Sequence, residues 1–217
     1  MSTSWIQRAR PIIQGLLALL VLKVVGVTFE SYRDYVPPDF EVAFLIGREG
    51  YFFSGYQWSF YPHIVAGPCS LLLGLLLLSE RFRCWRPHWH RRLGRVQVAI
   101  VLLIVVPSGL AMAWYAAAGP GAGVGFASLA VATGGTVIQG WRAAVQRRFE
   151  DHRRWMQRCF ALLFSAVVIR VNGGLGLVCG IESEWYYLQT AWTSWLLPLL
   201  VLELWRRYLP PAPRSVP

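Results

Sequence analysis

Histidine is the residue type in this chain that is best suited to hold a cofactor. The histidines are His63, His88, His90 and His152. Membrane b-type cytochromes bind haem between two histidines on facing helices. His90 and His152 each stand in a basic segment before an apolar run, so they could bind one haem b at the cytoplasmic face. His63 lies toward the opposite face without a second histidine, which argues against a two-haem path. Alternatively, His90 and His152 brace helix starts beside lipid phosphates.

The segment around His90 also contains ligands for a metal ion. Cys84, His88, His90 and His152 could converge at the cytoplasmic face, and thiolate and imidazole groups suit zinc or copper. The spacing Cys84-x-x-x-His88-x-His90 matches no zinc-finger pattern. Cys159 could join these ligands, or it could simply be a small apolar residue at a helix start.

Two cations stand inside apolar runs, where charge is expensive. Lys23 and Arg170 are each about 11 residues from the cytoplasmic end of their run, which is roughly 16 Å at 1.5 Å per residue. No acidic residue stands at that depth, and a guanidinium group does not lose its proton in proteins. We therefore expect Lys23 and Arg170 to line a polar pocket in the bundle interior.

Further polar residues are expected at a similar depth and would complete this pocket. They are Asn172 and Gln139 and, by depth and polarity alone, Ser108, Thr136 and Trp192. A ligand of the pocket would be anionic or would carry a carbonyl group. A haem propionate, a quinone oxygen and a small anion all meet that description.

A structural role for Arg170 is the alternative. Gly173, Gly174 and Gly176 follow it closely, and glycines weaken a helix. The helix is expected to kink or unwind at these glycines. Backbone carbonyls that lose their helical partners there would accept hydrogen bonds from Arg170.

Long apolar runs must position all these side chains. Apolar residues make up 55% of the 217 residues and charged residues 15%, against about 25% charged in an average soluble domain. Each run is close to the roughly 20 residues that cross the hydrocarbon core. We predict an all-α, polytopic transmembrane bundle. It is a single membrane domain, residues 1–209, with six spans at 12–29, 60–78, 96–118, 124–145, 159–179 and 187–204.

The other segments join or follow these spans. Residues 30–59 form an outer loop, in which 40–53 is too short and too charged to span the membrane. We expect that part to lie on the membrane surface. Residues 210–217 form a Pro-rich tail that is expected to be disordered. The four cysteines show no disulfide-type spacing, and we predict no disulfide.

The basic residues predict the orientation. With the N-terminus and the C-terminus inside, the cytoplasmic segments hold 17 of the 21 Lys and Arg residues, and the outer segments hold Arg33 and Arg48. This is the positive-inside pattern of a multi-pass protein of the cell membrane, such as a bacterial cytoplasmic membrane. The net charge of +10 therefore suits anionic lipid head groups on the cytoplasmic side. We reject nucleic acid as a partner.

Several short motifs resemble a family of predicted membrane proteins, the domain of unknown function 2306 family. The resemblance covers about residues 40–207. The residues that carry it are Tyr61-Pro62-His63, Gly67-Pro68, His90-Arg91, Gly94-Arg95, Ser108-Gly109, Gly125-Phe126, His152-Arg153-Arg154-Trp155-Met156-Gln157-Arg158, Arg170 and Glu203. It implies a multi-span membrane protein, and it supplies no set of catalytic residues.

Two classes of function remain open. The first is a membrane redox or cofactor-binding protein, with haem or quinone near Arg170 or near the His90 and His152 pair. The second is a non-catalytic carrier of a small solute, or an accessory membrane protein. The chain contains no Gly-rich phosphate loop, no nucleophile elbow and no paired intramembrane carboxylates. Whether the protein is an enzyme is left undecided by its sequence.

Overall fold

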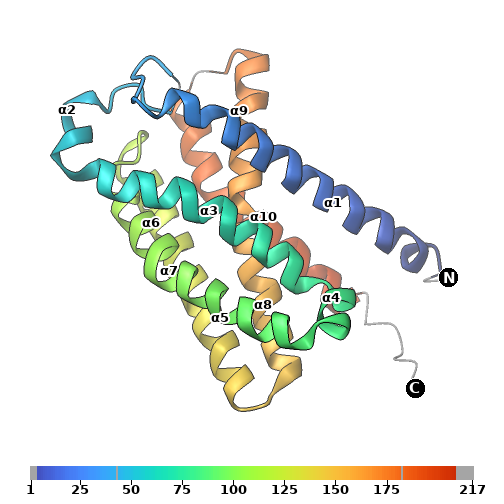
Figure 1. Ribbon diagram of the computed structural model, residues 1–217. Helices are drawn as coiled ribbons and strands as arrows, with labels where there is room; N and C mark the ends of the chain where they lie inside the picture. Colours follow the sequence, from blue (N-terminus) through green and yellow to red (C-terminus); the bar gives the residue numbers. More distant parts are fainter. Residues whose placement is uncertain (1–3, 43, 182, 209–217) are drawn as a thin grey trace.

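The computed structural model describes residues 4–42, 44–181 and 183–208, and helices dominate this part of the chain (Figure 1). No strand occurs in it, so the all-α prediction is confirmed. The predicted tail at 210–217 lies outside the described residues. The elements are α1 (Ser4–Glu30), η1 (Ser31–Asp34), α2 (Glu49–Tyr51), η2 (Phe52–Tyr56), α3 (Gln57–Leu78), α4 (Glu80–Trp85), α5 (Pro87–Ile100), η3 (Val101–Val105), α6 (Val106–Ala113), α7 (Gly119–Val145), α8 (Phe149–Leu163), α9 (Ser165–Cys179) and α10 (Glu184–Tyr208).

Five helical segments are long and apolar enough to cross a membrane. They are Pro11–Asp34, Glu49–Leu78, Pro87–Ala113, Gly119–Val145 and Phe149–Cys179. These segments coincide in order with the first five predicted spans. The sixth predicted span lies on α10, which is an unbroken helix of 25 residues. This helix is not among the five, and its first half is rich in Trp, Tyr, Thr and Gln.

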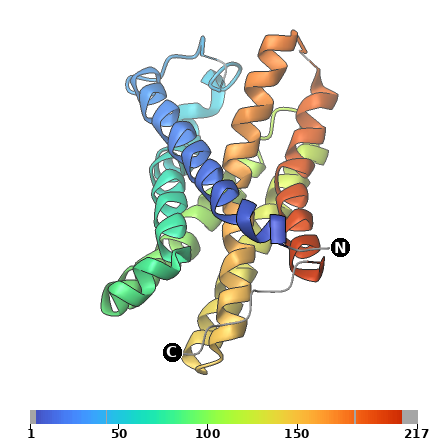
Figure 2. The ribbon, with the colours of Figure 1, turned by 90° about the vertical axis from the view of Figure 1, so that its right-hand side faces the viewer.

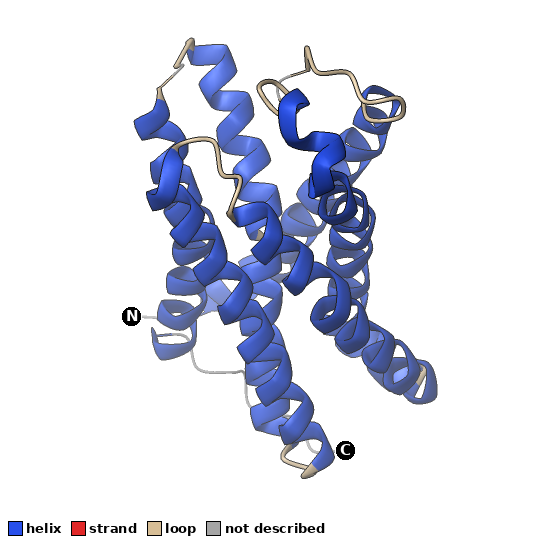
Figure 3. Ribbon diagram, turned by 90° about the vertical axis from the view of Figure 1, so that its left-hand side faces the viewer, coloured by secondary structure: helices blue, strands red, loops and turns tan. Residues whose placement is uncertain are grey.

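The helices run between two ends of the molecule (Figure 3). At the first, called here the aromatic end, the segment 31–56 meets the turn between α6 and α7, where Arg48 bonds the carbonyl oxygen of Tyr115. At the second, called here the basic end, Arg153 of α8 pairs with Glu80 of α4. Arg206 of α10 also bonds the carbonyl oxygen of Arg154 there.

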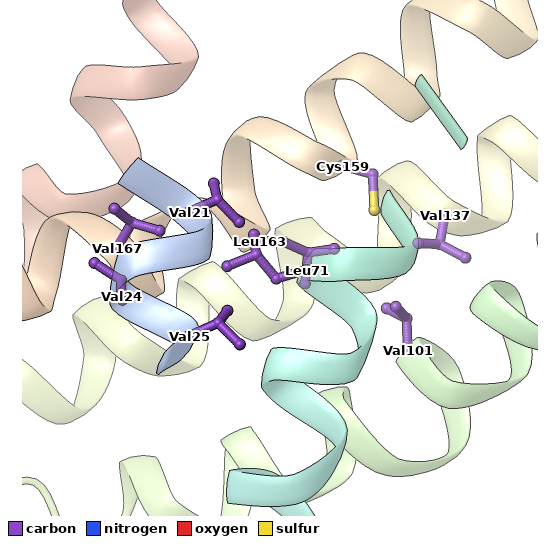
Figure 4. Packing of buried hydrophobic residues seen from close by; sticks show 9 residues of the cluster. All are labelled: Val21, Val24, Val25, Leu71, Val101, Val137, Cys159, Leu163 and Val167. Atoms are coloured by element: carbon purple, nitrogen blue, oxygen red, sulfur yellow. The ribbon is translucent and has the colours of Figure 1, made fainter. Parts of the chain in front are cut away.

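A core of buried aliphatic side chains holds the helices together near mid-length (Figure 4). It consists of Val21, Val24, Val25, Leu71, Val101, Val137, Cys159, Leu163 and Val167. Side chains from α1, α3, η3, α7, α8 and α9 meet in it. In lipid, such contacts stabilise by close packing, because the surrounding tails are as apolar as the side chains. This core fixes where α9 crosses α1.

The predicted break at the glycines of the fifth span is wrong. The helix is interrupted by a turn at Phe164, between α8 and α9. Beyond it, α9 continues without interruption through Gly173, Gly174 and Gly176. Close packing explains at least one of these glycines. A Cβ atom on Gly176 would lie 2.8 Å from Cε1 of Tyr186, so glycine allows α10 to approach α9.

Candidate functional site

Arg170 lies on α9, one turn beyond the core residue Val167 toward the aromatic end. Its side chain is exposed, and Nη1 is 3.5 Å from the carbonyl oxygen of Ala166 on the same helix. Among the described residues no ion pair joins Arg170 to a carboxylate. The guanidinium instead lies within electrostatic range of His63, Tyr32 and Tyr35. A charged donor group with unused hydrogen-bonding capacity thus lies in the neighbourhood of an imidazole and two phenols.

His63 is held by a short chain of hydrogen bonds between α3 and α6. Its Nδ1 is 2.9 Å from Oγ of Ser108, and this hydroxyl donates to the carbonyl oxygen of Ile104 at 2.5 Å. Because the single hydroxyl proton is used there, Nδ1 of His63 is the donor to Oγ. This tautomer leaves Nε2 as the acceptor nitrogen of the ring.

Local backbone features explain why His63 and Ser108 meet. The segment η3, Val101–Val105, is a π-helical stretch just before Pro107 and Ser108, and such stretches often occur at functional sites. A Cβ atom on Gly109 would be 3.4 Å from Cε1 of His63. A larger residue at 109 would therefore crowd the imidazole ring.

Two tyrosines place the segment after α1 against α3. The hydroxyl of Tyr32 donates to the carbonyl oxygen of Ile64. The hydroxyl of Tyr61 donates to the backbone carbonyl oxygen of Tyr35 at 2.9 Å. The ring of Tyr35 meets the ring of Phe60 edge to face, with centroids 5.2 Å apart. Burial raises the pKa of Tyr35, so its phenol remains protonated at neutral pH. We call Arg170, His63, Tyr32 and Tyr35 the Arg170 site.

The Arg170 site lies where two helices separate. Figure 2 shows α1 and α9 crossing and then diverging toward the aromatic end. The crossing is at the core contacts of Val21, Val24 and Val25 with Val167. Arg170 stands just beyond it, which explains why its side chain is exposed while Val167 is fully buried. The site combines the cationic donor Arg170 with the imidazole acceptor of His63.

Three residues that were predicted to line the same pocket lie elsewhere. Lys23 is exposed on the face of α1 opposite Val21 and Val25. Gln139 is exposed on α7, whose buried face instead contains residues such as Thr133 and Val137. Asn172 follows Arg170 by two residues of an unbroken helix, about 200° around the axis. Its carbonyl oxygen accepts a hydrogen bond from Tyr186 of α10 at 2.8 Å.

The other polar residues expected in the pocket divide in the same way. Ser108 joins the Arg170 site through His63. Thr136 is buried within α7 and donates to the carbonyl oxygen of Thr133 at 2.8 Å. Trp192 donates from Nε1 to the carbonyl oxygen of Gly121 at 3.2 Å, between α10 and the start of α7. Depth alone therefore identified polar residues without showing which helix face they occupy.

Two of the histidines at the basic end lie near each other. His90 of α5 and His152 of α8 lie within electrostatic range of each other. Nδ1 of His152 is 2.8 Å from the carbonyl oxygen of Gly140, so Nδ1 carries the proton and Nε2 is left as an acceptor. Nδ1 of His90 is buried and has no partner in the described part of the chain.

The predicted metal site does not gain its other ligands in this structure. Cys84 and His88 are exposed, and Cys159 lies in the apolar core. Within the residues that the structure describes, no three His, Cys, Asp or Glu side chains gather as a metal site would require. The structure thus brings His90 and His152 together without Cys84 and His88.

An ion-pair network closes the basic end. Arg158 of α8 binds Glu203 of α10 through two hydrogen bonds, Nε to Oε1 at 2.7 Å and Nη2 to Oε2 at 3.1 Å. Arg206 adds a bond from Nη2 to Oε1 of Gln157 at 2.5 Å. Two-pronged pairs of this kind fix orientation as well as distance. The network therefore fastens α10 to α8 below the Arg170 site.

Arg48 is a buried cation that several hydrogen bonds hold in place, and its sequence position did not single it out. In the segment 40–53, which we expect to lie on the membrane surface, Leu45 and Phe52 belong to a buried cluster together with Tyr56 and Phe60. Arg48 is 8% exposed and donates from Nε to the carbonyl oxygen of Phe44 at 2.7 Å.

Arg48 also ties this cluster to the rest of the aromatic end. Its Nη1 donates to the hydroxyl of Tyr51 at 2.9 Å and to the carbonyl oxygen of Tyr115 at 3.0 Å. Burial opposes the charge, but the phenols of Tyr56 and Tyr51 outweigh it and raise the pKa of Arg48. The sequence feature that could have indicated this role of Arg48 is the presence of Phe44 four residues before it and Tyr56 eight residues after it, since a guanidinium packs on aromatic rings.

Comparison with known proteins supports the sequence motifs. The model of a family described as predicted membrane protein (DUF2306) matches residues 60–206, a stretch that contains His63, Arg170 and the Arg158–Glu203 pair. No curated protein and no solved structure matches the chain. With its several apolar helices and a match over most of its length, the chain belongs to this family of predicted membrane proteins.

Proposed function

We propose that this membrane protein binds a lipophilic ligand of the quinone and quinol class at the Arg170 site. The observation that carries the proposal is the exposed guanidinium of Arg170, which has no carboxylate partner in the described residues and lies within electrostatic range of His63. A cation kept inside a membrane helix normally has a partner, a cavity or a ligand. The Arg170 site offers a ligand one donor group, the guanidinium of Arg170, and one acceptor, Nε2 of His63.

The two groups select for different parts of such a ligand. A guanidinium presents N–H donors and no acceptor, so it suits a carbonyl or a phenolic oxygen. Nε2 of His63 is an acceptor in the tautomer fixed by Ser108, so it suits a hydroxyl group. A quinol offers both kinds of oxygen. A simple inorganic anion would use Arg170 but would find no donor on His63.

The proposal includes a topology of six spans with both termini in the cytoplasm, in the cell membrane. Five segments meet the length and hydropathy required of a span, and we propose α10 as the sixth. Tyr187 in its first turn lies near Ala117, and Trp192 donates to the carbonyl oxygen of Gly121, both at the aromatic end. Its last turn joins the arginines of α8. Arginines concentrate at the basic end, which supports a cytoplasmic location for that end and contact with anionic lipid head groups.

The test measures quinone content and binding in the detergent-purified protein. Solvent extracts of the wild type are expected to contain quinone in a fixed ratio to protein, and added decylubiquinol to bind saturably. Arg170→Leu and His63→Leu should each lower that affinity by about tenfold or more, since each removes a polar contact in a dry site. Gln139→Leu, which removes an exposed polar group of α7, is the matched control.

Two outcomes would contradict the proposal. The first is equal binding by wild type, Arg170→Leu and Gln139→Leu, which would show partition into detergent alone. The second is loss of folded protein in both Arg170→Leu and Arg170→Lys, which would make Arg170 a structural brace. A wild type without bound or bindable quinone would favour the non-catalytic alternative, a carrier of a small solute or an accessory subunit.

Haem b between His90 and His152 is a second candidate, supported by a separate observation. Histidines that bind metals usually donate their other ring N–H to a carbonyl or carboxylate, as His152 does to Gly140. An optical spectrum decides this candidate. A Soret band that disappears in both His90→Leu and His152→Leu supports haem, and a colourless folded protein refutes it.

A further inference from the structure

The outward face of α1 carries a stripe of residues at helix-packing spacing. Its members are Ile12, Leu16, Leu19, Lys23 and Gly26, which repeat at intervals of four and three residues. Ile12, Leu16 and Leu19 are 65%, 61% and 64% exposed. An alternation of four and three is the seam of two helices that pack side by side in a left-handed pair.

Nothing in the described chain covers this stripe. The opposite face of α1 packs against α3 and α9 through Val21, Val24 and Val25. Lys23 is exposed, and a Cβ atom on Gly26 would meet no atom within 4 Å. In Figure 1, α1 runs along the edge of the molecule. The stripe therefore faces lipid or a partner.

Lys23 makes lipid a poor neighbour for this face. The charge stands inside the apolar segment Pro11–Asp34, far from its basic end. Lysines near a span end reach the interface with their long side chain. On α1 the Cα–Cβ bond tilts toward the helix N-terminus, so Lys23 extends away from the nearer aromatic end. The distance of more than ten residues to the other end is roughly 16 Å, which the side chain cannot cover.

A second copy of this chain cannot neutralise Lys23. The sequence contains 11 Asp and Glu residues, and the one that lies deepest in a predicted span, Glu203, is near the basic end and is paired with Arg158. The remaining acids lie in the segments that connect the spans or next to them. The carboxylate that would match Lys23 in depth must therefore come from a different protein.

We propose that α1 docks a transmembrane helix of another membrane protein, and that this helix carries an Asp or Glu side chain opposite Lys23. Gly26 allows the two backbones to approach beside the ion pair, as small residues do in membrane helix pairs. Leu19 and Leu16 continue the contact toward the basic end. This surface lies on the opposite side of α1 from the core and does not depend on the ligand of the Arg170 site.

The proposal is tested with a defined helix as the probe. The full chain carries a fluorescent donor and is reconstituted in phosphatidylcholine vesicles with an acceptor-labelled Leu-Ala transmembrane peptide. One peptide has a single Glu at the depth of Lys23, and a second peptide has Gln there. Energy transfer at increasing peptide density gives the relative affinity of each peptide for each variant.

The wild type is expected to prefer the Glu peptide by about tenfold or more, because an unpaired charge in lipid is costly on both helices. Lys23→Arg should keep this preference, Lys23→Leu should abolish it, and Gln139→Leu should leave it unchanged. Gly26→Leu should weaken the binding of both peptides. The inference is overturned if the wild type does not distinguish the peptides, or if Lys23→Leu retains the preference.

Discussion

Replacing Arg48 by leucine should loosen the aromatic end while the rest of the bundle stays folded. Leucine fills much of the apolar volume, but the bonds from the guanidinium to Tyr115 and Tyr51 disappear. Hydrogen bonds to a charged group contribute about 1.5–3 kcal/mol each. The bond to the Tyr115 carbonyl joins this segment to the α6–α7 turn, so we expect local opening to become easier by about 2–3 kcal/mol.

That free energy corresponds to a roughly 30- to 150-fold faster exchange of protected amides, since each 1.4 kcal/mol is tenfold. Hydrogen exchange with mass spectrometry on peptides from 44–56 measures it, provided that reclosing is fast relative to exchange. Arg48→Lys should lie between wild type and Arg48→Leu, because lysine keeps the charge without the planar fork. Arg33→Leu, which removes an exposed arginine of the same end, should change little.

Two results would refute this reasoning. If exchange in 44–56 rises less than about threefold in Arg48→Leu, the guanidinium contributes little, as most exposed ion pairs do. If all helices lose protection together, Arg48 stabilises the whole bundle and not the aromatic end.

Two further predictions rest on single contacts, and a third rests on the proposed orientation. Gly123→Ala should destabilise the protein by about 1–3 kcal/mol in reversible unfolding, because its Cβ would lie 2.8 Å from the backbone oxygen of Ala113. Gly135→Ala is the control: a Cβ there meets no atom within 4 Å, so the free energy of unfolding should not change. A double-mutant cycle on Arg158 and Glu203 should give a coupling of about 0.5–1 kcal/mol, since both side chains are partly exposed. In a single-cysteine variant that keeps Cys84, a membrane-impermeant maleimide should leave Cys84 unlabelled in intact cells and should label it once the cells are permeabilised.

Each of these measurements has a clear opposite outcome. Equal stability of the two alanine variants would show that α6 and α7 do not approach as described. A coupling near zero would remove Arg158 and Glu203 from the contacts that fasten α10 to α8. Labelling of Cys84 from outside would reverse the proposed orientation.

The helices of this protein were predictable because their information is local. The apolar runs are long enough that each one reports a helix regardless of its neighbours. The family motifs were equally local, and the family match covers 60–206. The arginines of the basic end likewise came together as their positions along the chain suggested, and Arg153 and Arg158 found partners on other helices.

Rotation of each helix about its axis was the part that the sequence concealed. In a membrane helix both the buried and the exposed face are apolar, so no periodicity shows which side Lys23 or Gln139 occupies. Asn172 was misplaced because a broken helix was expected after Arg170. On an unbroken helix their separation of two residues already implies opposite faces.

The sequence predicted only part of the Arg170 site. Arg170 stood out as a cation inside an apolar run, but His63 was noted only as a histidine without a partner on its side of the membrane. Its connection to Ser108 depends on the packing of α3 against α6, which single-sequence patterns do not report. Tyr32 and Tyr35 enter through the turn after α1, a connection that no motif marks.

Photoaffinity labelling with an azido-quinone tests the central claim most directly. Labelled peptides from the wild type are expected to come from α9 around Arg170 and from α3 around His63, with the label suppressed by unmodified quinone and by Arg170→Leu. Labelling that is confined to other helices, or that persists at these two places in Arg170→Leu, would contradict a quinone site at Arg170.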